Sequence, residues 1–159
     1  MVAILSPAAK ALDKLDIPYR QFTHPTPPST IEQAARERNQ EIGQVVRSIL
    51  FRLSEEDYAM VLIAGPWQVS WRGLRKHFNQ SRLTIASPEE VEEITGYQIG
   101  SVSPFGLPNP IPILVDEGVL AQPAVSLGSG LHGTAILLTK ENLLKALGDI
   151  EAGQFAAPR

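Results

Sequence analysis

The sequence predicts a single mixed α/β domain. The chain has 159 residues, a length that suits one domain burying roughly 70% of its unfolded surface. Hydrophobic residues make up 43% and charged residues 19% of the chain, which is ordinary for a globular protein. Helix-like and strand-like segments follow one another without a regular βαβ rhythm and without an internal repeat, so a mixed sheet is favoured over a doubly wound one.

The first part of the chain predicts two helices separated by a strand. Serine and proline at 6–7 are a helix start, and apolar residues follow at helical spacing. The segment YRQFTH at 19–24 is typical of a strand, which the prolines at 25–28 end. The sequence TIEQ at 30–33 matches a capping box and begins a helix that reaches about residue 38.

The middle of the chain predicts a β-hairpin followed by an amphipathic helix. The apolar runs at 45–53 and 58–65 are joined by a polar turn, SEED, which indicates two paired strands. Residues 70–78 place their large apolar side chains on one helical face. The opposite face is basic and carries Arg72, Arg75 and Lys76.

The last part predicts two helices around three strands. The segment SPEEVEEIT carries a capping box, and Gly96 occupies the position of a left-handed helix end. The strand-like segments lie at 112–118, 123–130 and 134–138, and a helix follows at 139–147. We therefore expect residues 1–150 to form the domain and residues 151–159 to form a loose C-terminal tail.

Composition and charge narrow the functional classes. The absence of cysteine removes disulfides and thiolate chemistry and favours a reducing compartment, so we expect a cytoplasmic protein. The N-terminus lacks a basic start followed by a long apolar run, so neither an export signal nor a membrane partner is expected. The net charge of −3 argues against a protein that coats nucleic acid, so any nucleic-acid contact is local.

A glycine-rich segment, GSGLHG, has the spacing of a dinucleotide-binding loop at Gly128, Gly130 and Gly133. That loop normally opens a helix, whereas a strand-like run follows here, so nucleotide binding is a weak alternative. The histidines His24, His77 and His132 lack metal-ligand spacing, and no metal or other cofactor is expected. His132, within the glycine-rich turn, is a candidate ligand contact.

Two further features indicate a site. The loop GYQIGSVSPFG at 96–106 combines three glycines, two serines and a proline, and loops of this kind often carry function on a rigid scaffold. In the strand predicted at 45–53, alternation places Arg47 on the same side as Ile49 and Phe51. An isolated charge on an apolar face is costly, so Arg47 must find a partner, reach solvent or face a cleft.

Taken together, these segments resemble the YbaK/prolyl-tRNA-synthetase-associated domain family. The resemblance is carried by VVRSILFR, VLIAG, VSLGSG and TKENLLKAL, and most specifically by TGYQIGSVSPFG followed by ILVDE. Members of this family are typically trans-editing aminoacyl-tRNA deacylases. The resemblance implies a mixed, barrel-like sheet flanked by helices and an aminoacyl-tRNA acceptor end as the ligand, with a synthetase as a further candidate partner.

The resemblance also assigns residues to the expected site. Arg47 occupies the place of a functional lysine in the family, and arginine keeps the charge without serving as a base at neutral pH. Ser101 stands where many relatives have a second glycine. The expected catalytic residues are Arg47, Gly100 and Ser103. The expected substrate-binding residues are Ser48, Ser101, Pro104, Phe105, Gly106, Gly128, Ser129, Gly130 and His132.

A tRNA ligand also gives the basic helix face at 70–78 an expected role. Its side chains, Arg72, Arg75 and Lys76, are candidates for contact with the tRNA backbone. Such contacts are local, as the net charge requires.

Two main functions remain open on sequence alone. An aminoacyl ester is already activated, so a positioned water and hydrogen-bond donors aimed at the oxyanion can hydrolyse it without a protein nucleophile. The alternative is a module of the same fold that binds the aminoacylated end or a synthetase without cleaving it. Turnover separates the two functions, while the amino acid, the tRNA and the oligomeric state are left open.

Overall fold

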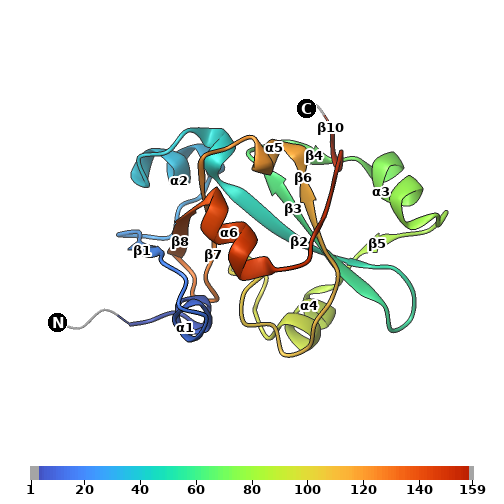
Figure 1. Cartoon of the computed structure of the whole chain (residues 1–159), viewed down its shortest axis with the longest axis horizontal. Coiled ribbons are helices and arrows are strands. Elements are labelled where there is room, and N and C mark those ends of the chain that lie inside the picture. Colours follow the sequence, from blue (N-terminus) through green and yellow to red (C-terminus); the bar gives the residue numbers. More distant parts are fainter. Residues whose placement is uncertain (1–3, 158–159) are drawn as a thin grey trace.

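The computed structural model describes residues 4–157, which form a larger five-stranded and a smaller three-stranded β-sheet, with a separate two-stranded pair, flanked by helices (Figure 1). In the larger sheet, β2 pairs with β3 and β5 antiparallel, while β6 pairs with β3 and β9 parallel. The strands in sheet order are β5 (Thr84–Ile85), β2 (Val46–Arg52), β3 (Tyr58–Ala64), β6 (Ile113–Asp116) and β9 (Glu151–Gly153). The predicted hairpin is therefore the centre of this sheet.

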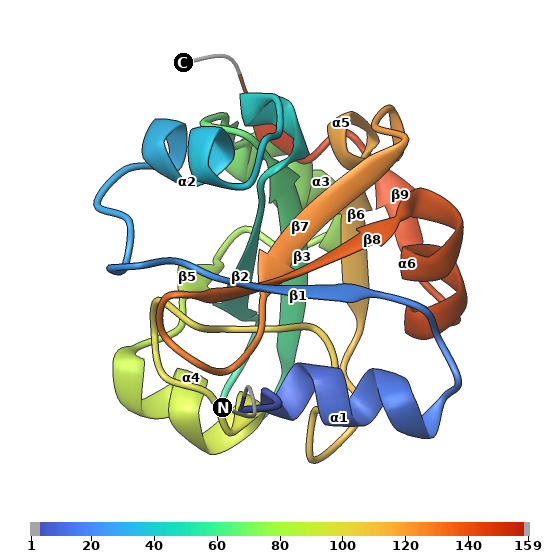
Figure 2. The same cartoon turned by 90° about the vertical axis from the view of Figure 1, so that its left-hand side faces the viewer.

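The smaller sheet is antiparallel and crosses in front of the larger one in Figure 2. Its strands in order are β1 (Arg20–Thr23), β8 (Thr134–Thr139) and β7 (Ala124–Gly128). A parallel bridge between Val45 and Ser126 joins the two sheets at the start of β2. The predicted mixed α/β domain with a mixed sheet flanked by helices is confirmed, and over residues 4–157 the strands form separate sheets without a closed barrel.

Three helices begin at the serine or threonine caps that the sequence predicts, whereas the short helix at Glu117–Leu120 was not predicted. Ser6 accepts a hydrogen bond from the Ala9 amide at the start of α1, and Ser87 forms a full capping box with Glu90. The helices are α1 (Pro7–Lys14), α2 (Ile31–Glu37), α3 (Trp71–Phe78), α4 (Pro88–Thr95), α5 (Glu117–Leu120) and α6 (Lys140–Leu147), with a 3₁₀ turn at Ile42–Gln44. Among residues 4–157, no helix combines the length and apolar character needed to cross a membrane.

The two faces of β2 pack against different parts of the molecule. Val46 belongs to the main core between the two sheets, and Leu50 packs against α4 through Val91. On the opposite face, Phe51 is buried against Leu74 of α3. Side chains alternate along a strand, so Ser48 lies between Val46 and Leu50 on the face away from α3.

Residues 151–157 differ from the loose tail predicted at 151–159, whose last two residues lie outside the described part of the chain. Strand β9 extends the larger sheet, and β10 (Ala156–Ala157) pairs antiparallel with β4 (Gln68–Val69). Phe155 between them is only 2% exposed. The short, glycine-containing sequence gives no strand signal by itself, and it is ordered because the buried carboxylate of Asp116 accepts hydrogen bonds from the amides of Phe155 and Ala156.

Candidate functional site

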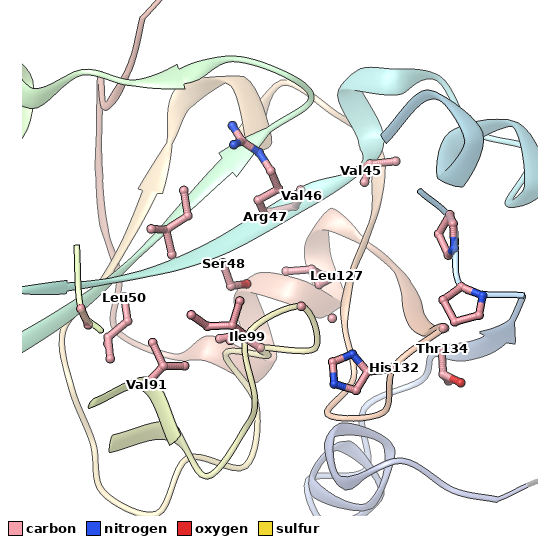
Figure 3. Close-up of a pocket in the computed structure, with 18 of the residues that line it drawn as sticks. Val45, Val46, Arg47, Ser48, Leu50, Val91, Ile99, Leu127, His132 and Thr134 are labelled. Carbon is pink, nitrogen blue, oxygen red and sulfur yellow. The ribbon is translucent and has the colours of Figure 1, made fainter. Parts of the chain in front are cut away.

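A cavity of about 570 Å³ opens beside the middle of β2. Strand β2 and α4 form one side of it, and the loops after α4 and β7 form the other (Figure 3). The apolar part of its lining comes from both sheets, from α4 and from the loop at 96–106. These apolar residues include Leu50, Ile85, Val91, Ile99, Val102 and Leu127.

Ser48 supplies a polar group at this wall. Figure 3 shows its side chain on the cavity side of β2, beside Ile99. Its hydroxyl is buried and has no hydrogen-bond partner among the described residues. An unpaired buried hydroxyl costs free energy. If the Ser48 side chain rotates, its hydroxyl can form a hydrogen bond with a ligand group or a water in the cavity.

The loop at 96–106 contributes to the cavity through only one part of its length. Gly100 lines the cavity with a left-handed backbone, φ +97°, and Ile99 beside it is 52% exposed. Gly96 ends α4 in a left-handed conformation, as predicted. The Tyr97 hydroxyl donates to the Phe105 carbonyl and closes the loop on itself.

Apart from Val102, the later part of this loop supports the fold and does not line the cavity. Ser103 is fully buried and accepts a hydrogen bond from the Phe105 amide at 3.2 Å. The Ser101 hydroxyl donates to the Gln98 carbonyl, while Phe105 joins the main core. Pro104 borders a different hollow beside α6, and Gly106 packs near Tyr97 and Ala11.

The glycine-rich turn after β7 forms the facing wall. Gly128 must be glycine, because a Cβ there would overlap the Val102 carbonyl oxygen. His132 borders the cavity, and its Nε2 lies 3.3 Å from Oε1 of Gln98. A Cβ on Gly100 would lie 3.3 Å from Cε1 of His132, so the two predicted loops meet at these residues.

Ser129 and Gly130 hold this turn in place. The Ser129 hydroxyl donates to the Thr134 carbonyl at 2.7 Å, and the Gly130 amide donates to the Ser101 carbonyl at 2.8 Å. The family resemblance grouped both residues with the substrate contacts. In the structure these two residues do not line the cavity. The Gly130 amide instead links the turn after β7 to the loop at 96–106.

Arg47 lies on the face of β2 that the alternation predicted, with Ile49 and Phe51. Its Nε donates to the Gly65 carbonyl at 3.1 Å, and its Nη2 donates to the Trp67 carbonyl. In Figure 3 the guanidinium points away from Ser48 and His132. The residue borders the cavity, and its charged group is held by the chain that follows β3.

Sequence reasoning missed a second arginine at the cavity. Arg38 lines it from the C-terminal end of α2 and donates to Nε2 of His24 at 3.0 Å and to Oγ of Ser126 at 2.9 Å. Burial lowers the pKa of the Arg38 guanidinium. No local pattern identifies this contact, because Ser126 is far from Arg38 in the sequence.

The basic face of α3 lies away from the cavity. Arg72, Arg75 and Lys76 are exposed, and α3 covers the face of the larger sheet opposite Ser48. Among residues 4–157, no group of three or more histidine, cysteine or carboxylate side chains is placed to hold a metal ion.

We predict that this basic face binds tRNA phosphates. Replacing Arg72, Arg75 and Lys76 with alanine should weaken tRNA binding and reduce the slope of log K against log salt by roughly one counterion for each phosphate that is no longer neutralised. Filter binding at several salt concentrations measures this slope. The control triple variant replaces the exposed Lys10, Lys14 and Lys145 and removes the same charge. An equal change in both variants would mean that only net charge matters.

Comparison with known proteins agrees with this arrangement. The family model of the aminoacyl-tRNA editing domain matches residues 26–146. The uncharacterized protein YwhH of Bacillus subtilis is 30% identical over 118 residues, which cover 74% of each chain. The proline–tRNA ligase of Thermosipho melanesiensis is 30% identical over 100 residues, 63% of this chain but only 17% of the ligase.

A solved structure shares nearly the whole fold. It is the crystal structure of a candidate trans-editing enzyme for prolyl-tRNA synthetase, 28% identical to this chain with a TM-score of 0.86. The match covers 97% of this chain and 99% of that one. The similarity therefore includes β2, β7, the loop at 96–106 and the turn after β7, which all line the cavity.

Proposed function

Since this chain belongs to the aminoacyl-tRNA editing domain family, we propose that it hydrolyses the ester of a mischarged aminoacyl-tRNA, with tRNA(Pro) as the first candidate. The observation that carries this proposal is the cavity itself. It is where β2, Gly100 and His132 come together, and it is large enough, at about 570 Å³, for an aminoacylated ribose. The similarity to prolyl-tRNA ligases supports the choice of tRNA.

The proposed chemistry uses a water as the nucleophile. The water oxygen attacks the ester carbonyl carbon, and the carbonyl oxygen becomes an oxyanion. This intermediate then collapses as the bond to the ribose oxygen breaks, and the ribose oxygen takes up the proton that the water loses, giving the free amino acid and the tRNA hydroxyl. The Gly100 amide donates to no other described residue, so it is available to stabilise the oxyanion. The apolar lining around Leu50 and Leu127 excludes bulk water and strengthens that interaction.

Polar side chains on the two walls position the reacting groups. We assign the Ser48 hydroxyl, which lacks a described partner, to the attacking water or to a ribose hydroxyl. His132 stands at the open side, next to Gln98, where it can contact the terminal ribose. Such positioning accounts for hydrolysis in the absence of a serine or cysteine nucleophile.

The proposal is tested with a panel of correctly and incorrectly charged tRNAs. Loss of the aminoacyl group is measured with substrate in large excess over protein, and mischarged tRNA(Pro) is expected to be hydrolysed through many turnovers. Release limited to one equivalent, or tight binding without release, would support the non-catalytic binding module. No hydrolysis of any charged tRNA would contradict the enzyme proposal.

Arg47 is proposed to support this site from the far side of β2. Arg47→Ala is expected to lower deacylation by about tenfold and to reduce stability by about 1–3 kcal/mol, because the carbonyls of Gly65 and Trp67 lose a charged donor. Arg47→Lys should retain more of both. Deacylation kinetics and thermal unfolding measure the two effects. Hydrolysis by Arg47→Ala at the parental rate would show that the family lysine position has no role here.

A further inference from the structure

The guanidinium of Arg38 borders the cavity, and buried neutral side chains hold it in position. Arg38 reaches the lining from α2 and contacts His24, whose side chain is fully buried, and Ser126, which is 0% exposed. The guanidinium is therefore fixed against the wall through Nε and Nη1. No carboxylate lies within salt-bridge distance of it among residues 4–157.

The direct partners of Arg38 carry no negative charge, and the Glu37 carboxylate is bound to His24 rather than to the guanidinium. An arginine Nε only donates, so Nε2 of His24 accepts its hydrogen, and Nδ1 of His24 donates to Glu37 at 2.6 Å. Ser126 likewise accepts from Arg38 and donates to Gln40 at 2.6 Å. Each neighbour is already committed to a further partner, and Nη2 of Arg38 makes no hydrogen bond with the described residues.

We infer that Arg38 binds an anionic group of the ligand, the phosphodiester on the 5′ side of the terminal nucleotide. This inference rests on the proposed acceptor-end substrate. A guanidinium held at two nitrogens presents its remaining donors in a fixed fork, which suits phosphate oxygens. A desolvated cation gains more from an anionic partner than an exposed one.

The position along β2 favours the phosphate over a carboxylate of the amino acid. Val45 pairs with Ser126, the residue that Arg38 contacts, and Ser48 lies three residues farther along the strand. At about 3.3 Å per residue this separation is roughly 10 Å. An amino-acid side chain attached to an ester beside Ser48 and Gly100 does not extend that far, whereas the 5′-phosphate lies across the ribose from the ester.

The test uses ligands that cannot be hydrolysed. The probes are 3′-alanylamino-3′-deoxyadenosine with and without a 5′-phosphate, and calorimetry measures both dissociation constants. The parent is expected to bind the phosphorylated probe about tenfold to a hundredfold more tightly, the usual range for a charged hydrogen bond. Arg38→Gln should lose this difference. Arg36→Gln is the matched control, because Arg36 is an exposed arginine of the same helix.

Each outcome separates this inference from the proposed function. Equal affinity of the parent for the two probes would overturn the phosphate assignment and leave acceptor-end binding intact. Failure of the parent to bind either probe would overturn acceptor-end recognition itself. A preference of the parent for an aspartyl over an asparaginyl probe, absent in Arg38→Gln, would assign Arg38 to a side-chain carboxylate instead. If Arg38→Gln does not fold, Arg38→Lys is used, and a full phosphate preference in it would contradict the fork geometry.

Discussion

Gly100→Val is expected to lower kcat/KM for deacylation by about a hundredfold while the protein remains folded. The backbone at Gly100 has φ +97°, and a Cβ there would lie 3.3 Å from Cε1 of His132. A branched side chain would therefore enter the cavity and displace the histidine. The same strain would move the Gly100 amide that we assign to the oxyanion.

Gly96→Val is the matched control for this prediction. Gly96 also has a positive φ, +78°, but nothing lies within 4 Å of a Cβ at that position. Both variants carry a backbone cost of about 1–2 kcal/mol, which thermal unfolding measures. Only Gly100→Val should lose deacylation relative to its folded fraction. An equal loss in both variants would assign the effect to backbone strain in the loop and would remove Gly100 from the site.

Asp116→Ala is expected to destabilise the protein by about 3 kcal/mol or more, because buried amides would lose their acceptor. The Asp116 carboxylate accepts from Phe155 at 2.7 Å, from Ala156 at 2.9 Å and from Gly118 at 2.9 Å. These bonds fix the C-terminal segment on the larger sheet. Denaturant unfolding measures the loss, and faster amide exchange at residues 151–157 is expected to accompany it.

The neighbouring Glu117→Ala provides the control, since Glu117 is exposed and has a single, long side-chain contact to Gln154 at 3.4 Å. Its stability should change by less than about 0.5 kcal/mol. If Asp116→Ala were as stable as Glu117→Ala, the segment after residue 150 would be held by the apolar packing of Phe155 alone.

The sequence alone predicted most of the secondary structure and the two loops of the site. Caps such as Ser87 with Glu90 act through hydrogen bonds to residues three positions away, so they are visible in a short stretch of sequence. The hairpin of β2 and β3 was also predictable, because its two strands are neighbours in the sequence and pair across a short turn. The alternation along β2 also placed Arg47 on the correct face, although it could not supply the carbonyls of Gly65 and Trp67 as its partners.

The tertiary structure alone decided which of the predicted residues reach the cavity. Ser48, Gly100, Gly128 and His132 line it, whereas Ser103 is turned inward to the Phe105 amide. A motif consists of neighbours in sequence, but the twist of a short loop directs adjacent side chains to opposite sides. The sequence could not choose between them.

The sequence alone also could not predict contacts between segments that are distant in the chain. Arg38 follows α2, and its guanidinium is held at the cavity by Ser126 of β7, which lies 88 positions away in the chain. The C-terminal strands form because Asp116 is buried beneath them. Both outcomes depend on long-range hydrogen bonds whose partners are fixed only when the sheets assemble, and this is the physical reason that local patterns did not predict them.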